Sequence, residues 1–215
     1  MRKILAGVAL SIVCFALLAC SNDDNKPQFQ TRGVMQPTGY CAADPRSVAE
    51  AEKISDIDEG NGCGVRNAWS ATALGGVALD KPEILNCATV YTASKWLMDV
   101  VQPAAEQSFG SRVVKIDVPS AYACRPRNNV RGAKLSEHGL GNAIDVSRFT
   151  LADGRSIDVL NGWYGDSDSR QFLRTVRGEA CGRFSTVLGP GSDAYHRDHI
   201  HMDLQPQRGG GPYCH

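Results

Sequence analysis

Six cysteines beyond residue 20 restrict the fold of this 215-residue chain more than any other feature. They are Cys41, Cys63, Cys87, Cys124, Cys181 and Cys214. In an exported chain an even set of widely spaced cysteines is typical of disulfides, here up to three, and six cysteines allow fifteen connectivities. A Cys-bound metal is disfavoured because no C-x-x-C pair occurs. We therefore expect a disulfide-stapled domain whose pairing stays open.

Export is indicated by the N-terminal segment. Arg2 and Lys3 precede an apolar run that extends through Ala19, which is the layout of a secretory signal. A transmembrane anchor is the alternative, but the apolar character stops abruptly at Cys20 and polar residues follow. Cleavage is the better interpretation. The residues LLAC at 17–20 resemble the lipobox of bacterial lipoproteins, so we expect Cys20 to be acylated.

A lipid on Cys20 makes the expected product an anchored protein rather than a spanning one, because several acyl chains together hold a protein stably on a bilayer. The location would be the periplasm, and Ser21 resembles the signal for sorting to the outer membrane. Residues 21–62 are polar with few apolar side chains, a composition that buries little surface. We predict a signal peptide at 1–19, a tether at 20–62 and one domain at 63–215.

A nucleic-acid partner is not expected. The formal net charge is zero and the isoelectric point is near neutrality, whereas proteins that bind nucleic acids normally carry a basic face.

The domain reads as a mixture of helices and short strands. Asn86 can cap a helix that Gly110 closes, and Pro103 should kink or interrupt it. Strands are predicted at RVVKIDV, SAYAC, NAIDVSRF, FSTVL and HIHMDL, with a hairpin around Asp153-Gly154. A helix begun by Asp168 is expected at 168–181, and a short helix at 47–53. Because strands and helices do not alternate strictly, we predict an α+β fold with a mainly antiparallel sheet and flanking helices.

Four of the five histidines lie in two short blocks, SEHGLGNAID and HRDHIHMD. Residues i and i+2 of a strand point to the same side. His199 and His201 can therefore face one cleft while Ile200 and Met202 enter the core. A metal site is the leading explanation for three histidines within six residues.

The first block supplies the complementary ligands. Two glycines in SEHGLGNAID permit a tight path, after which Ala143 and Asp145 share one face of a strand and Ile144 the other. An unpaired carboxylate in this apolar run would be costly to bury, and a metal removes that cost. We expect His138 and Asp145 to converge.

Two imidazoles and one carboxylate form a tetrahedral zinc site with one open corner for water, whereas structural sites are more often closed by a fourth protein ligand. Zinc lowers the pKa of bound water to about 7. We expect one zinc ion at His138, Asp145 and His201. A peptide hydrolase needs a side chain that moves a proton from the attacking water to the leaving amine. His199 is placed for this role, and His196 can assist.

Three further residues were considered for the site. Asp198 and Asp203 can orient imidazoles, since a metal-bound histidine usually donates its other N–H to a carboxylate or carbonyl. His215 is expected to be part of a solvated tail.

These fragments carry a family resemblance. From about Cys63 to Cys214, the segments WLMDVVQPAA, SAYACRPRN, LSEHGLGNAIDV, VLGP and HRDHIHMD resemble the bacterial extensin-like C-terminal family. That family is similar to the LAS zinc peptidases, grouped with lysostaphin, D-alanyl-D-alanine carboxypeptidases and penicillin-insensitive murein endopeptidases. They share SxHxxGxAxD followed by HxH, and both halves are present here.

The resemblance implies an LAS-type zinc peptidase core with the three ligands above, His199 as the catalytic histidine and His196 as the accessory one. A glutamate base is disfavoured because Asp198 occupies its position. Arg125 resembles a substrate-binding arginine. Ser136 is left open between a substrate contact and a turn cap.

The implied activity is cleavage of peptidoglycan stem peptides or cross-bridges, with endopeptidase favoured over carboxypeptidase. Two alternatives stay open: a catalytically silent, zinc-containing wall-binding lipoprotein, and a zinc amidohydrolase for another envelope amide.

Overall fold

The computed structural model describes residues 41–215, and all of them belong to one compact unit. The predicted signal peptide, the lipid acceptor Cys20 and the first part of the tether lie outside the described residues. Within 41–215, no helix is both long and apolar enough to cross a bilayer.

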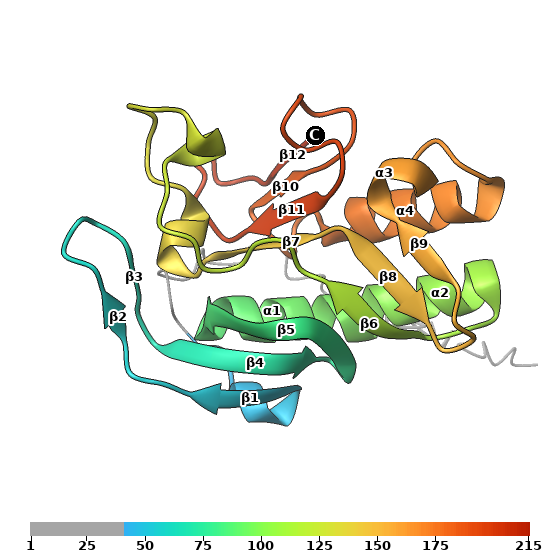
Figure 1. The fold of residues 1–215 in the computed structure, drawn as a ribbon, viewed down its shortest axis with the longest axis horizontal. Helices are drawn as coiled ribbons and strands as arrows, with labels where there is room; N and C mark the ends of the chain where they lie inside the picture. The colour runs from blue at the N-terminus through green and yellow to red at the C-terminus, as the bar shows by residue number, and fades with distance from the viewer. Residues whose placement is uncertain (1–40) are drawn as a thin grey trace, which may run out of the picture. The chain divides into compact units, whose positions relative to one another are not determined.

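A six-stranded and a four-stranded sheet form the framework (Figure 1). The larger sheet has the order β1-β4-β5-β6-β8-β9 and the smaller one β12-β10-β11-β7. All neighbours are antiparallel except β5 with β6 and β10 with β12. The predicted α+β class with mainly antiparallel sheets is confirmed. The strands of the larger sheet are β1 (Ala49–Lys53), β4 (Ala68–Leu74), β5 (Val77–Asn86), β6 (Val113–Asp117), β8 (Arg148–Leu151) and β9 (Ser156–Asp158).

The remaining elements are short or flank these sheets. The smaller sheet is built from β7 (Ala143–Val146), β10 (Thr186–Leu188), β11 (Ile200–Asp203) and β12 (Tyr213–Cys214), and a separate hairpin from β2 (Ile57–Asp58) and β3 (Gly64–Val65). The α-helices are α1 (Cys87–Trp96), α2 (Gln102–Phe109), α3 (Val159–Gly162) and α4 (Ser167–Ala180), with a π-helical turn η2 (Leu97–Val101). The 3-10 turns are η1 (Pro45–Ser47), η3 (Arg127–Asn129) and η4 (Glu137–Leu140).

The helix from α1 through η2 to α2 connects the parallel pair β5 and β6, as a crossover must. The Asn86 carboxamide caps it by accepting from the Thr89 backbone N–H at 2.9 Å. Gly110 ends it with a left-handed φ of 62°. Both predicted ends are confirmed. Pro103 follows the π-helical turn, which replaces the regular hydrogen-bond ladder where the proline ring would obstruct it.

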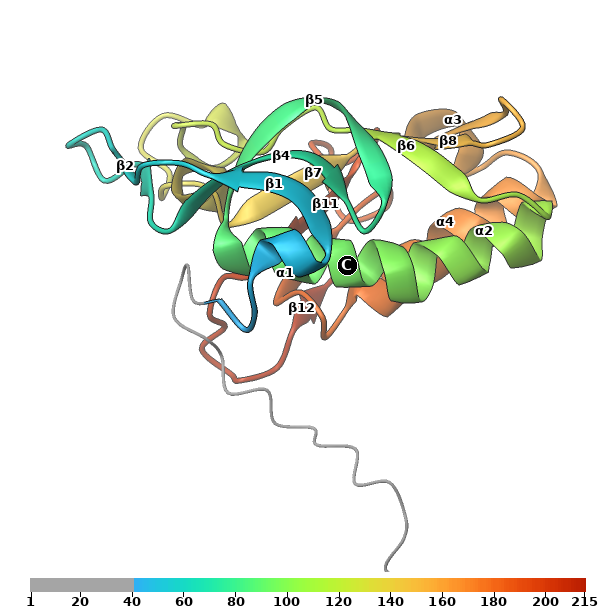
Figure 2. The same cartoon turned by 90° about the horizontal axis from the view of Figure 1, so that it is seen from below.

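The core lies where this helix packs against the larger sheet and α4. Figure 2 shows α1 running along β4 and β5, with α4 beside α2. Trp96 and Phe149 are fully buried with ring centroids 6.2 Å apart, and Phe149 meets Phe172 edge-on at 5.1 Å. The Trp96 indole N–H donates to the Val176 carbonyl at 2.9 Å, which ties α1 to α4.

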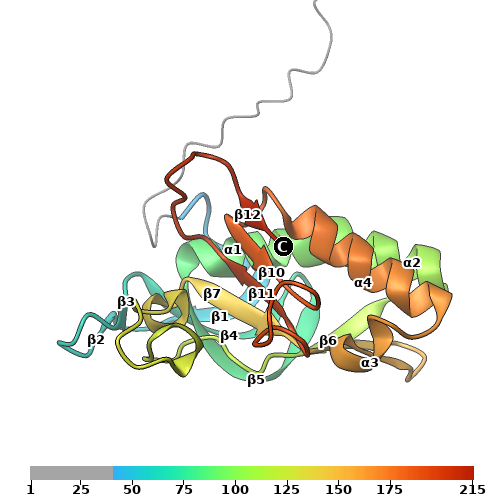
Figure 3. The ribbon, with the colours of Figure 1, turned by 90° about the horizontal axis from the view of Figure 1, so that it is seen from above.

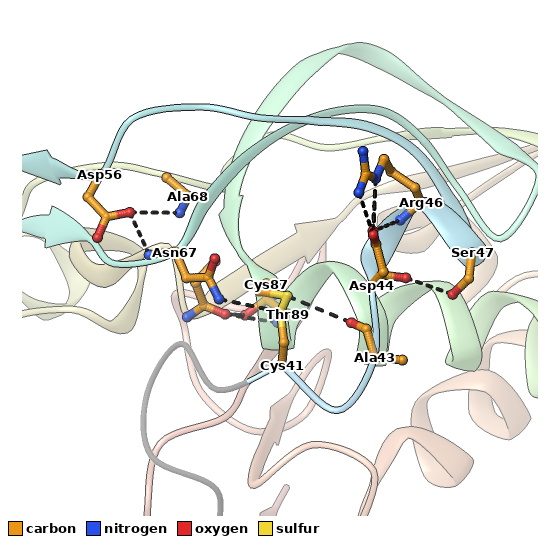
Figure 4. The surroundings of a disulfide bond; sticks show 11 residues. Cys41, Ala43, Asp44, Arg46, Ser47, Asp56, Asn67, Ala68, Cys87 and Thr89 are labelled. Carbon is orange, nitrogen blue, oxygen red and sulfur yellow. Dashed lines mark hydrogen bonds and ion pairs between the residues drawn. A yellow bond between two sulfur atoms is a disulfide. The ribbon is translucent and has the colours of Figure 1, made fainter.

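The disulfides pair Cys41 with Cys87, Cys63 with Cys124 and Cys181 with Cys214. Figure 4 shows the first of these, which fastens the N-terminal segment to the first residue of α1. Nearby, the Asp56 carboxylate accepts from the backbone N–H groups of Asn67 and Ala68. The expected disulfide-stapled domain is confirmed.

The expected tether and the short helix at 47–53 were wrong in part. Residues 49–53 form β1, which pairs with β4, so the folded region begins before residue 63. Ala49 and Ala51 pack on the core while Glu50, Glu52 and Lys53 are exposed. Two alanines bury too little apolar surface to distinguish a strand from a polar linker in the sequence.

Four other local expectations needed correction. SAYAC is not a strand but an irregular segment. Its backbone bonds go to two different elements, because the Ser120 carbonyl accepts from Asp145 N–H and Ala123 N–H donates to the His138 carbonyl. NAIDVSRF forms two strands in different sheets, β7 and β8, because Ser147 N–H bonds to the Asp117 carbonyl between them. The cap of α4 is Asp166 rather than Asp168, and a short strand, β12, follows the two expected to be last.

Candidate metal centre

Pairing of β7 with β11 places Asp145 directly opposite His201. Figure 3 shows β11 and β7 neighbouring each other at one side of the smaller sheet. Ile144, Ile200 and Met202 point into the core, as predicted. Asp145 and His201 project from the other face and are 3% and 8% exposed.

His138 reaches the same point from the turn η4. The Ser136 hydroxyl caps this turn by accepting from the His138 backbone N–H at 3.4 Å. Gly141 ends it in the left-handed region, where a Cβ would lie 2.7 Å from Val65. The His138 ring is held from behind, because Nδ1 contacts the Ala121 carbonyl at 2.7 Å. Its Nε2 atom is thereby turned toward Asp145.

The three side chains form a compact group. The Asp145 Oδ1 atom lies 2.8 Å from His201 Nδ1, Asp145 Oδ2 lies 3.2 Å from His138 Nε2, and the two ring nitrogens are 3.2 Å apart. One ligand atom from each residue lies within 4.8 Å of the others, so this buried group could hold a metal ion. The ring orientation assigns Nε2 of His138 and Nδ1 of His201 as the available donors.

Two members of the group, Asp145 and His201, have shifted pKa values. Burial favours a raised pKa for Asp145, but the bonds with His138 and His201 outweigh it and hold the pKa of that carboxyl well below its usual range. Burial likewise opposes charge on His201, yet Asp145 and Asp203 raise the pKa of its imidazole to about 9. The Asp203 carboxylate lies 3.0 Å from His201 Nε2, on the side away from Asp145. It is therefore placed to orient this imidazole, as expected.

Asn142 joins the segments that carry the three side chains. Its carboxamide donates to Glu137 Oε2 at 2.7 Å and accepts from the Asn86 side chain at 3.0 Å. Its backbone N–H donates to the Glu137 carbonyl, and its carbonyl accepts from Leu204 N–H beyond β11. Asn142 is fully buried. The turn η4, β7, β11 and the start of α1 thus meet at one residue.

His199 and His196 lie beside the group. His199 Nδ1 contacts Asp198 at 2.8 Å, while its Nε2 lies 3.7 Å from Asp145 Oδ2. His196 Nδ1 contacts Asp193 Oδ1 at 2.7 Å, and its ring is 5.3 Å from the His199 ring. Burial lowers the pKa of His196, although Asp193 opposes this. His196 therefore stays neutral near pH 7, and His199 directs Nε2 toward the candidate ligands.

An open cleft of about 600 Å³ gives access to the group. One wall comes from the segment before η4 and the other from residues 193–199; η3 and η4 are the olive and yellow turns in Figure 1. The predicted metal-ligating, catalytic and substrate-binding residues all line it, namely Arg125, Ser136, His138, Asp145, His196, His199 and His201, whereas Asp198 does not. His215 is exposed and is not among the lining residues.

Sequence reasoning missed several residues of the site. Glu137, Asp193 and Arg127 line the cleft, and Asn142 organises it. Asn142 was detectable, because it is a polar residue inside the apolar run of the first histidine block. Arg127 gave no local signal, since its importance depends on a contact with Gln205, far along the chain.

The fold and the site together define an α+β, disulfide-linked domain with a buried His/Asp group that could hold a metal ion. The family model described as extensin-like protein C-terminus matches residues 40–215. The chain therefore belongs to the extensin-like C-terminal family. No curated protein and no solved structure matches it.

Proposed function

We propose that this protein is a zinc-dependent peptidase that cleaves peptidoglycan peptides, with cleavage inside the peptide favoured over removal of its last residue. The observation that carries the proposal is the buried group of His138, Asp145 and His201 at the base of an open cleft, with His199 beside it. The similarity of SxHxxGxAxD and HxH to the zinc peptidases supports the same function.

The donor set suits zinc. Imidazole nitrogens and a carboxylate oxygen are ordinary zinc ligands, and three protein ligands leave one position for water or substrate. The His138 and His201 rings are each fixed by a second contact, to the Ala121 carbonyl and the Asp203 carboxylate. Such contacts orient imidazole ligands in metal sites. When bound, zinc would polarise a carbonyl group and make water acidic enough to ionise near neutral pH.

His199 is the proposed proton-transfer residue. Asp198 holds Nδ1, which leaves Nε2 facing the cleft beside Asp145. Nε2 can accept a proton from water and donate it to the departing amine, a role that typically contributes about 10²–10⁴-fold to rate. His196, held by Asp193, supports the same wall as a neutral side chain.

Arg125 and Ser136 have separate proposed roles. Arg125 lines the cleft and can stabilise negative charge on the carbonyl oxygen as the amide is attacked. Ser136 is 5% exposed and already serves as the cap of η4, so its main contribution is to hold His138 in place.

The substrate proposal depends on the place of the protein in the cell. We propose that residues 1–19 are removed and that acylated Cys20 anchors the protein in the periplasm, facing the cell wall from the outer membrane. The cleft is open to solvent rather than enclosed, which suits a branched or cross-linked peptide better than a small buried ligand.

The test is digestion of purified peptidoglycan sacculi by protein lacking residues 1–20, with and without a chelator. Mass spectrometry of released fragments identifies the bond. We expect chelator-sensitive release that zinc restores. His199→Ala should reduce release at least about 10²-fold while retaining one zinc ion. His215→Ala is the matched control and should release fragments at the normal rate.

Two results would replace the proposal. Intact sacculi from a zinc-loaded protein that still binds them would favour a wall-binding lipoprotein without turnover. Cleavage of small acyl-amides but not of sacculi would favour an amidohydrolase for another envelope component.

A further inference from the structure

The cleft contains two guanidinium groups, and the proposed chemistry uses only that of Arg125. Arg125 and Arg127 both line it and are half-buried. Within residues 41–215, neither guanidinium forms an ion pair with a carboxylate. Charged groups removed from water normally find an opposite charge, so an unpaired, half-buried guanidinium in a cleft favours an anionic ligand.

Arg127 differs from Arg125 because its side chain is tied to the metal-binding group. His201 Nε2 contacts Asp203 Oδ2 at 3.0 Å, and Asp203 Oδ1 accepts from Gln205 N–H at 2.8 Å. The Gln205 carboxamide oxygen then accepts from Arg127 Nη2 at 2.8 Å. Three successive contacts thus hold the Arg127 guanidinium at a set place relative to the candidate ligands.

The backbone beneath Arg127 is also held. Its N–H donates to the Lys134 carbonyl at 2.9 Å. The next two residues, Asn128 and Asn129, adopt left-handed φ values of 54° and 57° and line the cleft. Asparagine adopts the left-handed region more readily than other non-glycine residues, so both positions suit this turn. The hydrogen bond to Lys134 and this turn together define the backbone that carries Arg127.

Glu137 is an internal competitor for Arg127. It lines the cleft and interacts electrostatically with Arg127, but its carboxylate accepts from the Asn142 side chain and forms no direct ion pair with the guanidinium. Gln205 is a neutral acceptor and uses only part of the guanidinium. The remaining N–H groups of Arg127 are available to a carboxylate, whose two oxygens match the guanidinium fork.

We propose that Arg127 is the specificity-determining residue of the cleft and binds a carboxylate of the substrate peptide. This inference rests on the proposed function and adds the chemical class of substrate, an acidic peptide. The carboxylate has two possible sources in a stem peptide, the C-terminal one and the internal α-carboxylate of the γ-linked D-glutamate. Both are carboxylates that a guanidinium can bind, and the experiment below distinguishes them.

The experiment measures binding rather than turnover. Zinc-loaded His199→Ala protein is titrated calorimetrically with a tetrapeptide, L-Ala-γ-D-Glu-L-Lys-D-Ala, and with two forms of it, one amidated at the C-terminus and one at the D-glutamate. We expect one amidation to weaken binding roughly tenfold to a hundredfold, since hydrogen bonds between charged groups are of that strength. The sensitive position identifies the source.

Adding Arg127→Ala to this protein should make the sensitive amidated peptide and the parent peptide bind with equal affinity. Arg127→Lys should retain part of the difference in affinity. Arg131→Ala is the matched control, because Arg131 is exposed in the same loop and does not line the cleft. It should preserve full discrimination. Discrimination that survives Arg127→Ala, or that Arg131→Ala removes equally, would overturn the proposal, as would failure of all three peptides to bind zinc-loaded protein. Discrimination without cleavage of sacculi by protein with His199 intact would leave the subsite standing and refute the peptidase.

Discussion

Asp203 is expected to couple metal binding to pH through His201. Burial disfavours the charged imidazole, but Asp145 and Asp203 outweigh burial and raise the pKa of His201 to about 9, against an ordinary value of 6.5. His201 therefore carries a proton on Nδ1 near pH 7, and a metal ion must displace it. The apparent affinity for zinc should rise about tenfold per pH unit between pH 6.5 and 8.5, with release of about one proton per ion.

The assay is calorimetric titration of chelator-treated protein with zinc in buffers of different ionisation enthalpy, which gives the number of protons released. Asp203→Asn should lower that number at pH 8, because it removes one of the two carboxylates that stabilise the imidazolium. Asp193→Asn is the matched control, since Asp193 contacts His196 rather than a candidate ligand. Equal zinc affinity at pH 6.5 and 8.5, or equal effects of the two substitutions, would refute the reasoning.

The same pKa has a consequence for the stability of the metal-free protein. Folding raises the pKa of His201 from 6.5 to about 9. The contribution of His201 to the free energy of unfolding is therefore fully present below about pH 6.5 and is lost as the pH rises through 9. The shift corresponds to about 3 kcal/mol at 1.36 kcal/mol per pKa unit. Urea unfolding of chelated protein at pH 6.5 and 9.5 measures it, and a pH effect that Asp203→Asn does not reduce would contradict the assignment.

Three further changes test the support around the site. Asn142→Ala should destabilise the fold by about 2–3 kcal/mol and weaken zinc binding by about 10–100-fold, because it breaks two buried hydrogen bonds behind the ligands. Unchanged zinc affinity in a calorimetric titration would exclude this role for Asn142. Gly141→Ala should cost at least about 1–2 kcal/mol in chemical unfolding, since φ is +59° and the new Cβ would meet Val65 at 2.7 Å, and a neutral effect would show that the turn is not required. Replacing both Cys63 and Cys124 by Ser opens a link across 61 residues and should cost about 4 kcal/mol, which a thermal melt under oxidising conditions would reveal or contradict.

Local patterns in the sequence predicted the parts of the site that depend on neighbouring residues. The alternation in HIHMD placed His199 and His201 on the cleft side and Ile200 in the core, as found. Asn86 and Gly110 were recognised as helix ends because capping uses groups within one turn. The convergence of His138 with Asp145 was also expected, and the structure brings them within 3.2 Å.

Other expectations failed because the deciding contacts are distant. β1 was read as tether because its two alanines give a weak apolar signal, and only pairing with β4 makes it a strand. SAYAC has strand-forming composition, yet its backbone bonds go singly to Asp145 and His138. NAIDVSRF is continuous in pattern but is divided at Ser147 between two sheets.

By itself, the sequence determined the α+β class, the existence of disulfides, the two ends of the long helix and the set of residues that meet as the candidate metal group. These follow from short-range periodicity, capping chemistry and the spacing of histidines and carboxylates. Only the tertiary structure decided which cysteines pair, how Asn142 joins four elements and why Arg127 faces the cleft. Those features are contacts between residues tens of positions apart. Local conformational preferences do not determine which distant groups the fold brings together.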